Sequence, residues 1–231
     1  MLINILGGDG CGKSTQIRRL LDWTSASLKH PARLLAKKTL FDRDLFPECD
    51  IFGITYETLA HERLPRMPDE ARALWLIYMN MALIRGAPAN PGEVVYLDGF
   101  WQKHYATEAA LGTDSSWLRQ VCAPFPEPDL TILLDLDPAV IVARSHEHKP
   151  YESGCDFACR DENFLQHQYR VRDILLTLAK ERGYFVVDAN RPEEELFGCL
   201  CSLIGPHIEK HANRRDTQPV SDEDKEPSAL T

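Results

Sequence analysis

The stretch Gly7-Gly8-Asp9-Gly10-Cys11-Gly12-Lys13-Ser14 decides the fold of this chain. It matches the pattern G-x-x-x-x-G-K-[ST], in which glycines let the backbone curl until successive N–H groups point at an anion. An apolar run over residues 2–6 precedes it and predicts a buried strand, and apolar residues at helical spacing follow it. A strand that passes through such a loop into a helix predicts a site for the phosphates of a nucleoside triphosphate.

The residues of this loop have separate expected roles. Lys13 is expected to reach the β- and γ-phosphates, and the hydroxyl of Ser14 is expected to occupy one Mg²⁺ position. The other residues expected to contact the triphosphate, mainly through their backbone N–H groups, are Gly8, Gly10, Cys11, Gly12 and Thr15.

The rest of the chain alternates between short apolar runs and helical patterns. Four further runs read as strands, at 32–36, 94–97, 130–136 and 184–187. The helical patterns cover 55–62, 69–85, 101–122, 139–144, 161–181 and a last stretch ending near 211. Strands separated by helices predict an α/β fold, with a five-stranded parallel sheet covered by helices on both faces. Ligands of such sheets bind at the carboxyl ends of the strands.

Composition predicts one folded domain and a tail. The chain has 231 residues, of which 44% are hydrophobic, and this suits a single domain over residues 1–211. Residues 145–160 are polar and predict a lid. Residues 212–231 hold three basic and five acidic residues with few apolar ones, which predicts a disordered acidic tail.

Charge and hydropathy exclude several partners. The formal net charge is −9, whereas a general grip on nucleic acid needs a basic surface. No apolar run approaches the roughly 18 residues of a membrane helix, and the start of the chain is too short for a signal peptide. We therefore expect a cytoplasmic protein with no membrane and no nucleic-acid partner, whose seven cysteines are free thiols.

The segment Asp9–Gln16, Asp-Gly-Cys-Gly-Lys-Ser-Thr-Gln, resembles the phosphate loop of the thymidylate kinase family of P-loop nucleoside monophosphate kinases. Later segments agree with that family in order: 98–100 (Asp-Gly-Phe), 128–135 (Pro-Asp-Leu-Thr-Ile-Leu-Leu-Asp) and 188–190 (Asp-Ala-Asn). The resemblance implies a P-loop NTPase fold and an ATP-dependent phosphotransferase with Mg²⁺ as cofactor. It implies ATP and a small-molecule acceptor as partners, and a homodimer.

The resemblance also assigns roles to particular residues. Asp9 matches a carboxylate that contacts the sugar of the acceptor, and Asp98 matches one that holds Mg²⁺ or orients the acceptor. The adenine of ATP is expected beside Arg144, Asn190 and Arg191.

Residues 9–11 contain no basic side chain, and family members of this type supply a cation from the lid instead. The candidates are Arg144, Lys149 and Arg160, with Arg160 as the first choice, because a guanidinium matches the charge of the transferring phosphoryl group. The expected catalytic residues are therefore Lys13, Asp98, Arg144 and Arg160.

The acceptor side departs from the family pattern at three arginines. Lys37-Lys38-Thr39-Leu40 stands where the family has an arginine after its second strand, Gly99 replaces the arginine of Asp-Arg-Tyr, and Asn80 replaces one on the long helix. A lysine is a point charge and does not reproduce the fork of an arginine. The acceptor residues expected here are Asp9, Lys38, Phe52, Asn80, Phe100 and Tyr105, with Lys103, His104 and Tyr56 as further candidates.

The acceptor and the class of function both stay open at this point. The acceptor could be a nucleoside monophosphate, a modified pyrimidine nucleotide, or a small phosphorylated or phosphonate metabolite. The chain could instead be a nucleotide-hydrolysing switch or an inactive nucleotide-binding protein. The lid and the lack of an Asn-Lys-x-Asp motif favour a kinase over a switch.

The lid also carries possible zinc ligands. His146, His148, Cys155 and Cys159 are the ligand types of a tetrahedral zinc site, but their spacing is irregular for one. We therefore do not expect zinc as a cofactor.

Overall fold

The structure is a computed structural model that describes residues 1–42, 44, 46, 53, 55–86, 90, 92–145 and 147–216. Its centre is a parallel sheet of five strands in the order β2-β3-β1-β4-β5. The strands are β1 (Leu2–Gly7), β2 (Ala32–Leu35), β3 (Val94–Asp98), β4 (Leu130–Asp135) and β5 (Phe185–Asp188). Each lies within a residue or two of the apolar run that predicted it, so the α/β prediction is confirmed.

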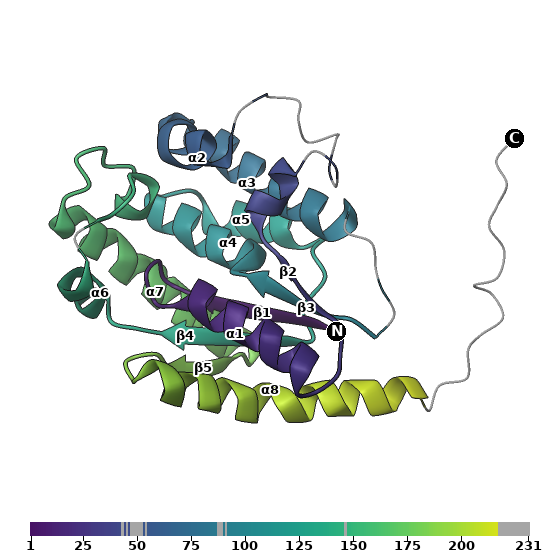
Figure 1. Cartoon of the computed structure of the whole chain (residues 1–231). Coiled ribbons are helices and arrows are strands. Elements are labelled where there is room, and N and C mark those ends of the chain that lie inside the picture. The colour runs from purple at the N-terminus through teal and green to yellow at the C-terminus, as the bar shows by residue number, and fades with distance from the viewer. Residues whose placement is uncertain are drawn as a thin grey trace, which may run out of the picture.

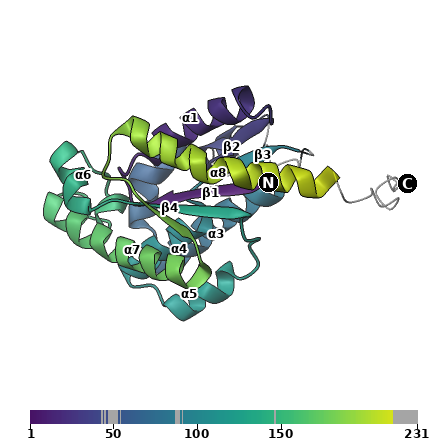
Figure 2. The ribbon, with the colours of Figure 1, turned by 90° about the horizontal axis from the view of Figure 1, so that it is seen from below.

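Helices cover both faces of the sheet (Figures 1 and 2). The helices α1 (Lys13–Ala26) and α8 (Glu193–Asp216) lie on one face and pack against each other. The other face carries α3 (Asp69–Gly86), α4 (Phe100–Leu111), α5 (Ser115–Cys122) and α7 (Asp161–Arg182). This two-sided cover explains why the strands read as continuous apolar runs.

The middle of the sheet is the most buried part of the molecule. Ile3 and Ile5 of β1 are completely buried, and Ile132 of the neighbouring β4 is as well. The edge strand β5 leaves Phe185 and Val186 about half exposed, at 43% and 50%. The loop after β1 therefore starts from a buried central strand, and sites built on such regular elements are held precisely.

Shorter elements connect the strands at the carboxyl edge of the sheet. They are the 3₁₀ helices η1 (Lys37–Phe41), η4 (Leu64–Arg66) and η5 (Tyr151–Ser153), the helices α2 (Tyr56–Thr58) and α6 (Pro138–Arg144), and the π-helical turn η3 (Leu59–Arg63). The lid expected at 145–160 contains η5. Among the residues that the structure describes, no helix combines the length and apolar composition of a membrane span.

The last helix extends further than the sequence indicated. It was expected to end near residue 211, but α8 continues to Asp216. The tail from 217 onward lies outside the described residues, so the division into a domain and a disordered tail stays a prediction.

Candidate active site

The phosphate loop joins β1 to α1 in a conformation that requires glycine. Gly10 and Gly12 have φ angles of 80° and 92°, which side chains rarely adopt. A Cβ on Gly7 would lie 2.8 Å from the carbonyl oxygen of Leu134 on β4. The glycines of the motif therefore allow both the curl of the loop and its close approach to the sheet.

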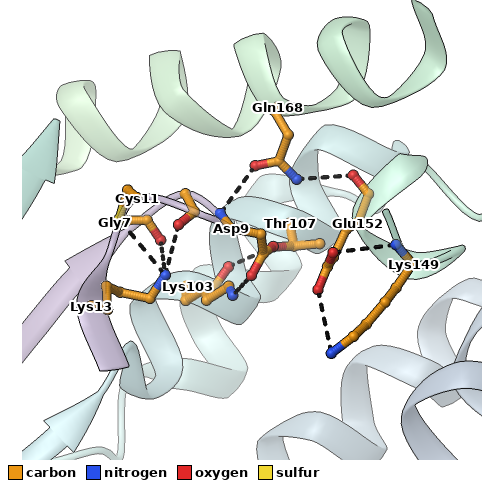
Figure 3. Close-up of polar contacts among 10 residues, drawn as sticks. Gly7, Asp9, Cys11, Lys13, Lys103, Thr107, Lys149, Glu152 and Gln168 are labelled. Carbon is orange, nitrogen blue, oxygen red and sulfur yellow. Dashed lines mark hydrogen bonds and ion pairs between the residues drawn. The ribbon is translucent and has the colours of Figure 1, made fainter. Parts of the chain in front are cut away.

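Lys13 is held inside this loop. Its side chain is buried, and its Nζ donates to the carbonyl oxygens of Gly7 at 3.0 Å and Gly8 at 2.7 Å (Figure 3). Cys11 is also buried, with its Sγ 3.9 Å from the same Nζ, so its side chain faces inward and only its backbone is available to a phosphate. The ammonium is thus already placed at the centre of the curled backbone.

A cavity of about 420 Å³ opens beside the loop. The phosphate loop, the ends of β2 and β3, the α2–η4 segment, α4 and the lid all contribute to its wall. The lining residues are Asp9, Gly10, Gly12, Lys13, Ser14, Thr15, Lys37, Tyr56, Ala60, Leu64, Asp98, Lys103, His104, Lys149, Tyr151 and Glu152.

In the wall of this cavity, Asp9 and Lys103 form an ion pair (Figure 3). Burial by itself would raise the pKa of Asp9, but the charges of Lys103 and Lys13 hold it well below its usual range. Burial likewise opposes the charge of Lys103, yet Asp9 and then Asp98 raise its pKa above the usual value. Both partners are therefore charged at neutral pH.

Two further basic groups in the cavity differ in charge state. Burial, and then the nearby charge of Lys103, lowers the pKa of Lys37 to about 7. Burial, followed by the charges of Lys37 and Lys103, lowers the pKa of His104 well below its usual value, so its imidazole is neutral at pH 7. Its Nδ1 makes no hydrogen bond with any described residue.

Hydrogen bonds fasten the lid to α4 and to α7. The hydroxyl of Tyr151 donates to Glu108 of α4 at 2.7 Å, and Glu108 forms a buried ion pair with Arg72 of α3. Gln168 of α7 accepts from the N–H of Asp9 at 3.4 Å and donates to the carbonyl oxygen of Glu152 at 2.9 Å (Figure 3). Gln168 thus connects the phosphate loop directly to the lid backbone.

Three expected acceptor residues belong to the core. Phe100 and Tyr105 are 3% and 4% exposed and pack in the cluster between α3 and α4. Asn80 is 1% exposed and donates to the carbonyl oxygen of Leu76 within its own helix. None of the three lines the cavity, so the structure does not bring them together with Asp9 there.

The lysine after β2 that lines the cavity is the neighbour of the expected one. Lys38 is exposed and does not line the cavity, whereas Lys37 does. Phe52, another expected acceptor residue, lies outside the described residues. Asp9 lines the cavity as expected.

The basic lid residue that lines the cavity is not Arg160, which was the first choice from the sequence. Arg160 is largely exposed and pairs through its Nε with Asp156 at 3.2 Å, so it does not face the cavity. Lys149 does line it. Arg160 instead lies at the start of α7, where it is the N-cap residue.

The expected adenine residues do come together. The Nη2 of Arg144 lies 3.5 Å from Oδ1 of Asn190, and Arg191 lies 3.8 Å from Asp188. Helix α6, which carries Arg144, touches the phosphate loop, since a Cβ on Gly10 would meet Ile141. The expected adenine site is therefore next to the expected phosphate site.

The possible zinc ligands have other contacts where they are described. His148 stacks on Phe164 and its Nε2 lies 3.1 Å from Asp161. Cys159 Sγ donates to the carbonyl oxygen of Asp156. Within the described part of the chain, which omits His146, no three histidine, cysteine or acidic side chains gather as a metal site.

Sequence reasoning missed Lys37, Tyr151 and Glu152. A signal for Lys37 existed, because it is only two residues beyond the end of β2 and ligands collect at strand ends. Tyr151 and Glu152 gave no such signal, because a lid follows no period that shows which side chains turn inward.

Comparison with known proteins agrees with this geometry. The family model described as thymidylate kinase matches residues 103–198. A thymidylate kinase of Leifsonia xyli subsp. xyli is 32% identical over 217 residues, which cover 89% of this chain and 95% of that protein. The chain belongs to the thymidylate kinase family. A probable thymidylate kinase of Saccharolobus solfataricus is 27% identical over 207 residues, covering 90% of this chain and 98% of that protein.

A solved structure supports the fold of this family member. The thymidylate kinase of Candida albicans superposes with a TM-score of 0.64 at 20% identity, covering 90% of this chain and 92% of that one. The chain is thus a P-loop kinase of the nucleoside monophosphate kinase type. The family favours phosphotransfer over the alternatives of a hydrolysing switch, an inactive binding protein or a kinase of a non-nucleotide metabolite.

Proposed function

We propose that the enzyme transfers the γ-phosphate of ATP to the phosphate of a nucleoside monophosphate bound in the 420 Å³ cavity. The observation that carries this proposal is that one cavity is lined both by the phosphate loop and by a separate set of charged side chains opposite it. An oxygen of the acceptor phosphate attacks the γ-phosphorus, the bond to the bridging oxygen breaks, and ADP leaves.

The donor half of the site positions and neutralises the triphosphate. The curled backbone presents its N–H groups, and Lys13 exchanges its bonds to Gly7 and Gly8 for the β- and γ-phosphates. Lys149 of the lid, in place of Arg160, stabilises the charge that spreads over the transferring group. The adenine lies beside Arg144, Asn190 and Arg191.

Mg²⁺ fits this donor set. Ser14 and Asp98 both line the cavity, and hydroxyl and carboxylate oxygens are the hard ligands that Mg²⁺ prefers. When bound, the ion would neutralise charge on the β- and γ-phosphates.

The acceptor half would hold the nucleotide between Asp9, Tyr56 and Leu64, which line the cavity. The names of the relatives make dTMP the first acceptor to test. The absence of arginines at 80 and 99 predicts that selection among nucleoside monophosphates differs from that of arginine-bearing relatives.

The test is ADP release with Mg²⁺·ATP and a panel of nucleoside monophosphates that includes dTMP and modified pyrimidine nucleotides. We expect acceptor-dependent turnover that falls by at least about 100-fold in Lys13→Ala, because a transition-state charge contact is lost. ADP release that is independent of every acceptor, or turnover unaffected by Lys13→Ala, would contradict the proposal.

A homodimer is the second part of this proposal. Leu74 and Tyr78 on one face of α3 are 49% and 43% exposed, and this apolar face suits a partner copy. Sedimentation of the wild type and of Leu74→Glu should show a dimer and a weakened dimer, whereas a monomeric wild type would contradict it. We also propose a cytoplasmic location, which fractionation would test.

A further inference from the structure

Gly99 and Lys103 lie in close contact at the start of α4. Gly99 caps the helix with a φ of 78°, and a Cβ placed on it would lie 3.0 Å from Cδ and 3.1 Å from Cβ of Lys103. The two residues are i and i+4, and helical side chains lean toward the N-terminus. The stem of Lys103 therefore lies so close to Gly99 that a side chain at position 99 would push against it.

The ammonium of Lys103 is directed into the cavity by Asp9. Their ion pair forms across the wall, and the two side chains are only 17% and 19% exposed (Figure 3). An ammonium has three donors, and the pair with Asp9 leaves capacity for an anionic ligand. The carboxylate of Asp9 thus positions the ammonium of Lys103 and leaves N–H donors for another ligand.

Lys37 adds a second cation on the same side. It follows β2, whose Leu35 is paired in register with Leu97 of β3, so Lys37 and Gly99 leave neighbouring strands at the same edge. The charge of Lys103 is one cause of the lowered pKa of Lys37, which shows that the two cations are close enough to repel. The arrangement becomes favourable when an anion lies between them.

An anion between Lys103 and Lys37 would be distinct from the triphosphate of the donor. Lys13 and the loop N–H groups serve the donor phosphates from the β1–α1 side. His104, which is 3% exposed and has an unpartnered Nδ1 among the described residues, lines the cavity beside Lys103. A second polar, anionic ligand group is therefore expected here.

We propose that Lys103 and Lys37 form a clamp for the phosphate of the acceptor nucleotide, with Lys103 lying over Gly99 and replacing the arginine missing at that position. This lysine clamp rests on the proposed function and specifies how its acceptor is held. Because an ammonium recognises charge rather than a planar fork, the clamp selects a dianionic phosphate with little demand on its orientation.

The first test measures binding and turnover in the full-length enzyme. Lys103→Met should raise the KM for dTMP and weaken dTMP binding in calorimetry about 10- to 100-fold, because a charged hydrogen bond is lost. The KM for ATP should stay within about twofold. Lys103→Arg should retain most of the affinity, and Lys180→Met on the exposed end of α7 controls for loss of a lysine charge.

The second test uses glycine variants that keep Lys103. Gly99→Ala and Gly183→Ala both place a side chain at positive φ, 78° and 69°, but only the first meets the stem of Lys103, since nothing lies within 4 Å of Gly183. Gly99→Ala should therefore raise the KM for dTMP about fivefold or more, and Gly183→Ala should not.

The outcomes separate the clamp from the proposed function. If the wild type turns over dTMP but Lys103→Met and Gly99→Ala leave its KM unchanged, the clamp is wrong and the function stands. If no nucleoside monophosphate is turned over, the function fails, and calorimetry with dTMP still decides whether Lys103 binds it. Equal effects of Gly99→Ala and Gly183→Ala would overturn the steric role of Gly99.

Discussion

At the scale of single residues, Lys37 in the cavity has a pKa close to neutral pH. Burial and the charge of Lys103 bring the pKa of Lys37 to about 7, while Asp9 and Asp98 act in the opposite direction and Lys13 adds to the lowering. The nearby His104 is neutral throughout this range, because its pKa lies well below its usual value. Lys37 is thus the group in the clamp expected to change charge between pH 6 and 9.

Acceptor binding without ATP and Mg²⁺ should take up a proton above pH 7. The free enzyme carries neutral Lys37 there, a nucleotide phosphate is already dianionic because its second pKa is about 6, and binding the dianion favours protonated lysine. Affinity should therefore weaken as pH rises from 7 to 9. Calorimetry of dTMP binding at pH 8, in buffers of different ionisation enthalpy, measures the uptake.

The control for this prediction is Lys37→Arg, whose guanidinium stays protonated over the whole range. Proton uptake should disappear in that variant, and affinity should lose its dependence on pH. An unchanged uptake in Lys37→Arg would show that another group takes the proton. Lys38→Met, one residue along but outside the cavity, should retain the uptake of the wild type.

A second residue-scale prediction concerns the lid. Lys149→Met should lower kcat about 10- to 100-fold with a smaller effect on the KM for ATP, because it would remove charge stabilisation of the transferring phosphoryl group. Arg160→Met should have a much smaller effect, since Arg160 does not line the cavity and Lys149 does. Steady-state kinetics on both variants decides, and a larger loss in Arg160→Met would restore the expectation from the sequence.

At the scale of elements, a buried network joins α3, α4 and the lid. The Nε of Arg72 lies 3.0 and 3.1 Å from the two oxygens of Glu108, and Arg72 also donates to the carbonyl oxygen of Met67 and to Asp69. Tyr151 adds a hydrogen bond from the lid to Glu108. Arg72 and Glu108 are 2% and 1% exposed, so Glu108 depends on Arg72 for a charged partner, whereas Arg72 also pairs with Asp69.

Removing one partner of this pair should be costly. Glu108→Leu should lower the free energy of unfolding by about 3 kcal/mol, because it leaves the buried charge of Arg72 with only the 60% exposed Asp69 as a carboxylate partner. Tyr151→Phe should cost only about 1 kcal/mol, the usual net value of one hydrogen bond. Urea unfolding followed by circular dichroism measures both.

The matched control is the exposed pair of Arg119 and Glu181, whose side chains are 46% and 42% exposed. Glu181→Leu removes an acidic partner of the same size and should cost less than about 1 kcal/mol. Similar losses in Glu108→Leu and Glu181→Leu would mean that burial does not make the Arg72–Glu108 pair important for stability.

The elements themselves were predictable, but the directions of their side chains were only partly so. Strands and long helices follow from runs and periods of apolar residues, which are local properties. The 3₁₀ helix η1 moved the inward lysine from 38 to 37, because its turn has three residues and leaves no period in so short a segment.

Helix α4 shows the same limit. Its Phe100 and Tyr105 were expected in the acceptor site because aromatic rings can stack on a base, yet they pack in the core with residues of α3 and α5. Lys103 could have been placed from its spacing of four residues to Gly99. The sequence predicted the lid but not which of its side chains turn inward, since the positions of Tyr151 and Glu152 depend on contacts with α4 and α7.

At the scale of the whole molecule, the donor and acceptor halves meet at one edge of a single sheet. The phosphate loop leaves the central strand β1, and Lys37 and Gly99 follow the neighbouring strands β2 and β3. The lid reaches both halves through Gln168 and Tyr151. Ligands of the two halves should therefore each stabilise the same folded unit.

This arrangement predicts separable thermal shifts. A non-hydrolysable ATP analogue with Mg²⁺, or dTMP, each at about 100 times its Kd, should add about 2.7 kcal/mol of stability and raise Tm by about 5–10 °C in a chain of this size. At the same ligand concentrations, Lys13→Ala should lose most of the shift from the ATP analogue and keep that from dTMP. Lys103→Met should do the reverse. Differential scanning calorimetry measures all four combinations, and loss of both shifts in either variant would show that the lysine supports the fold of the whole site rather than one ligand.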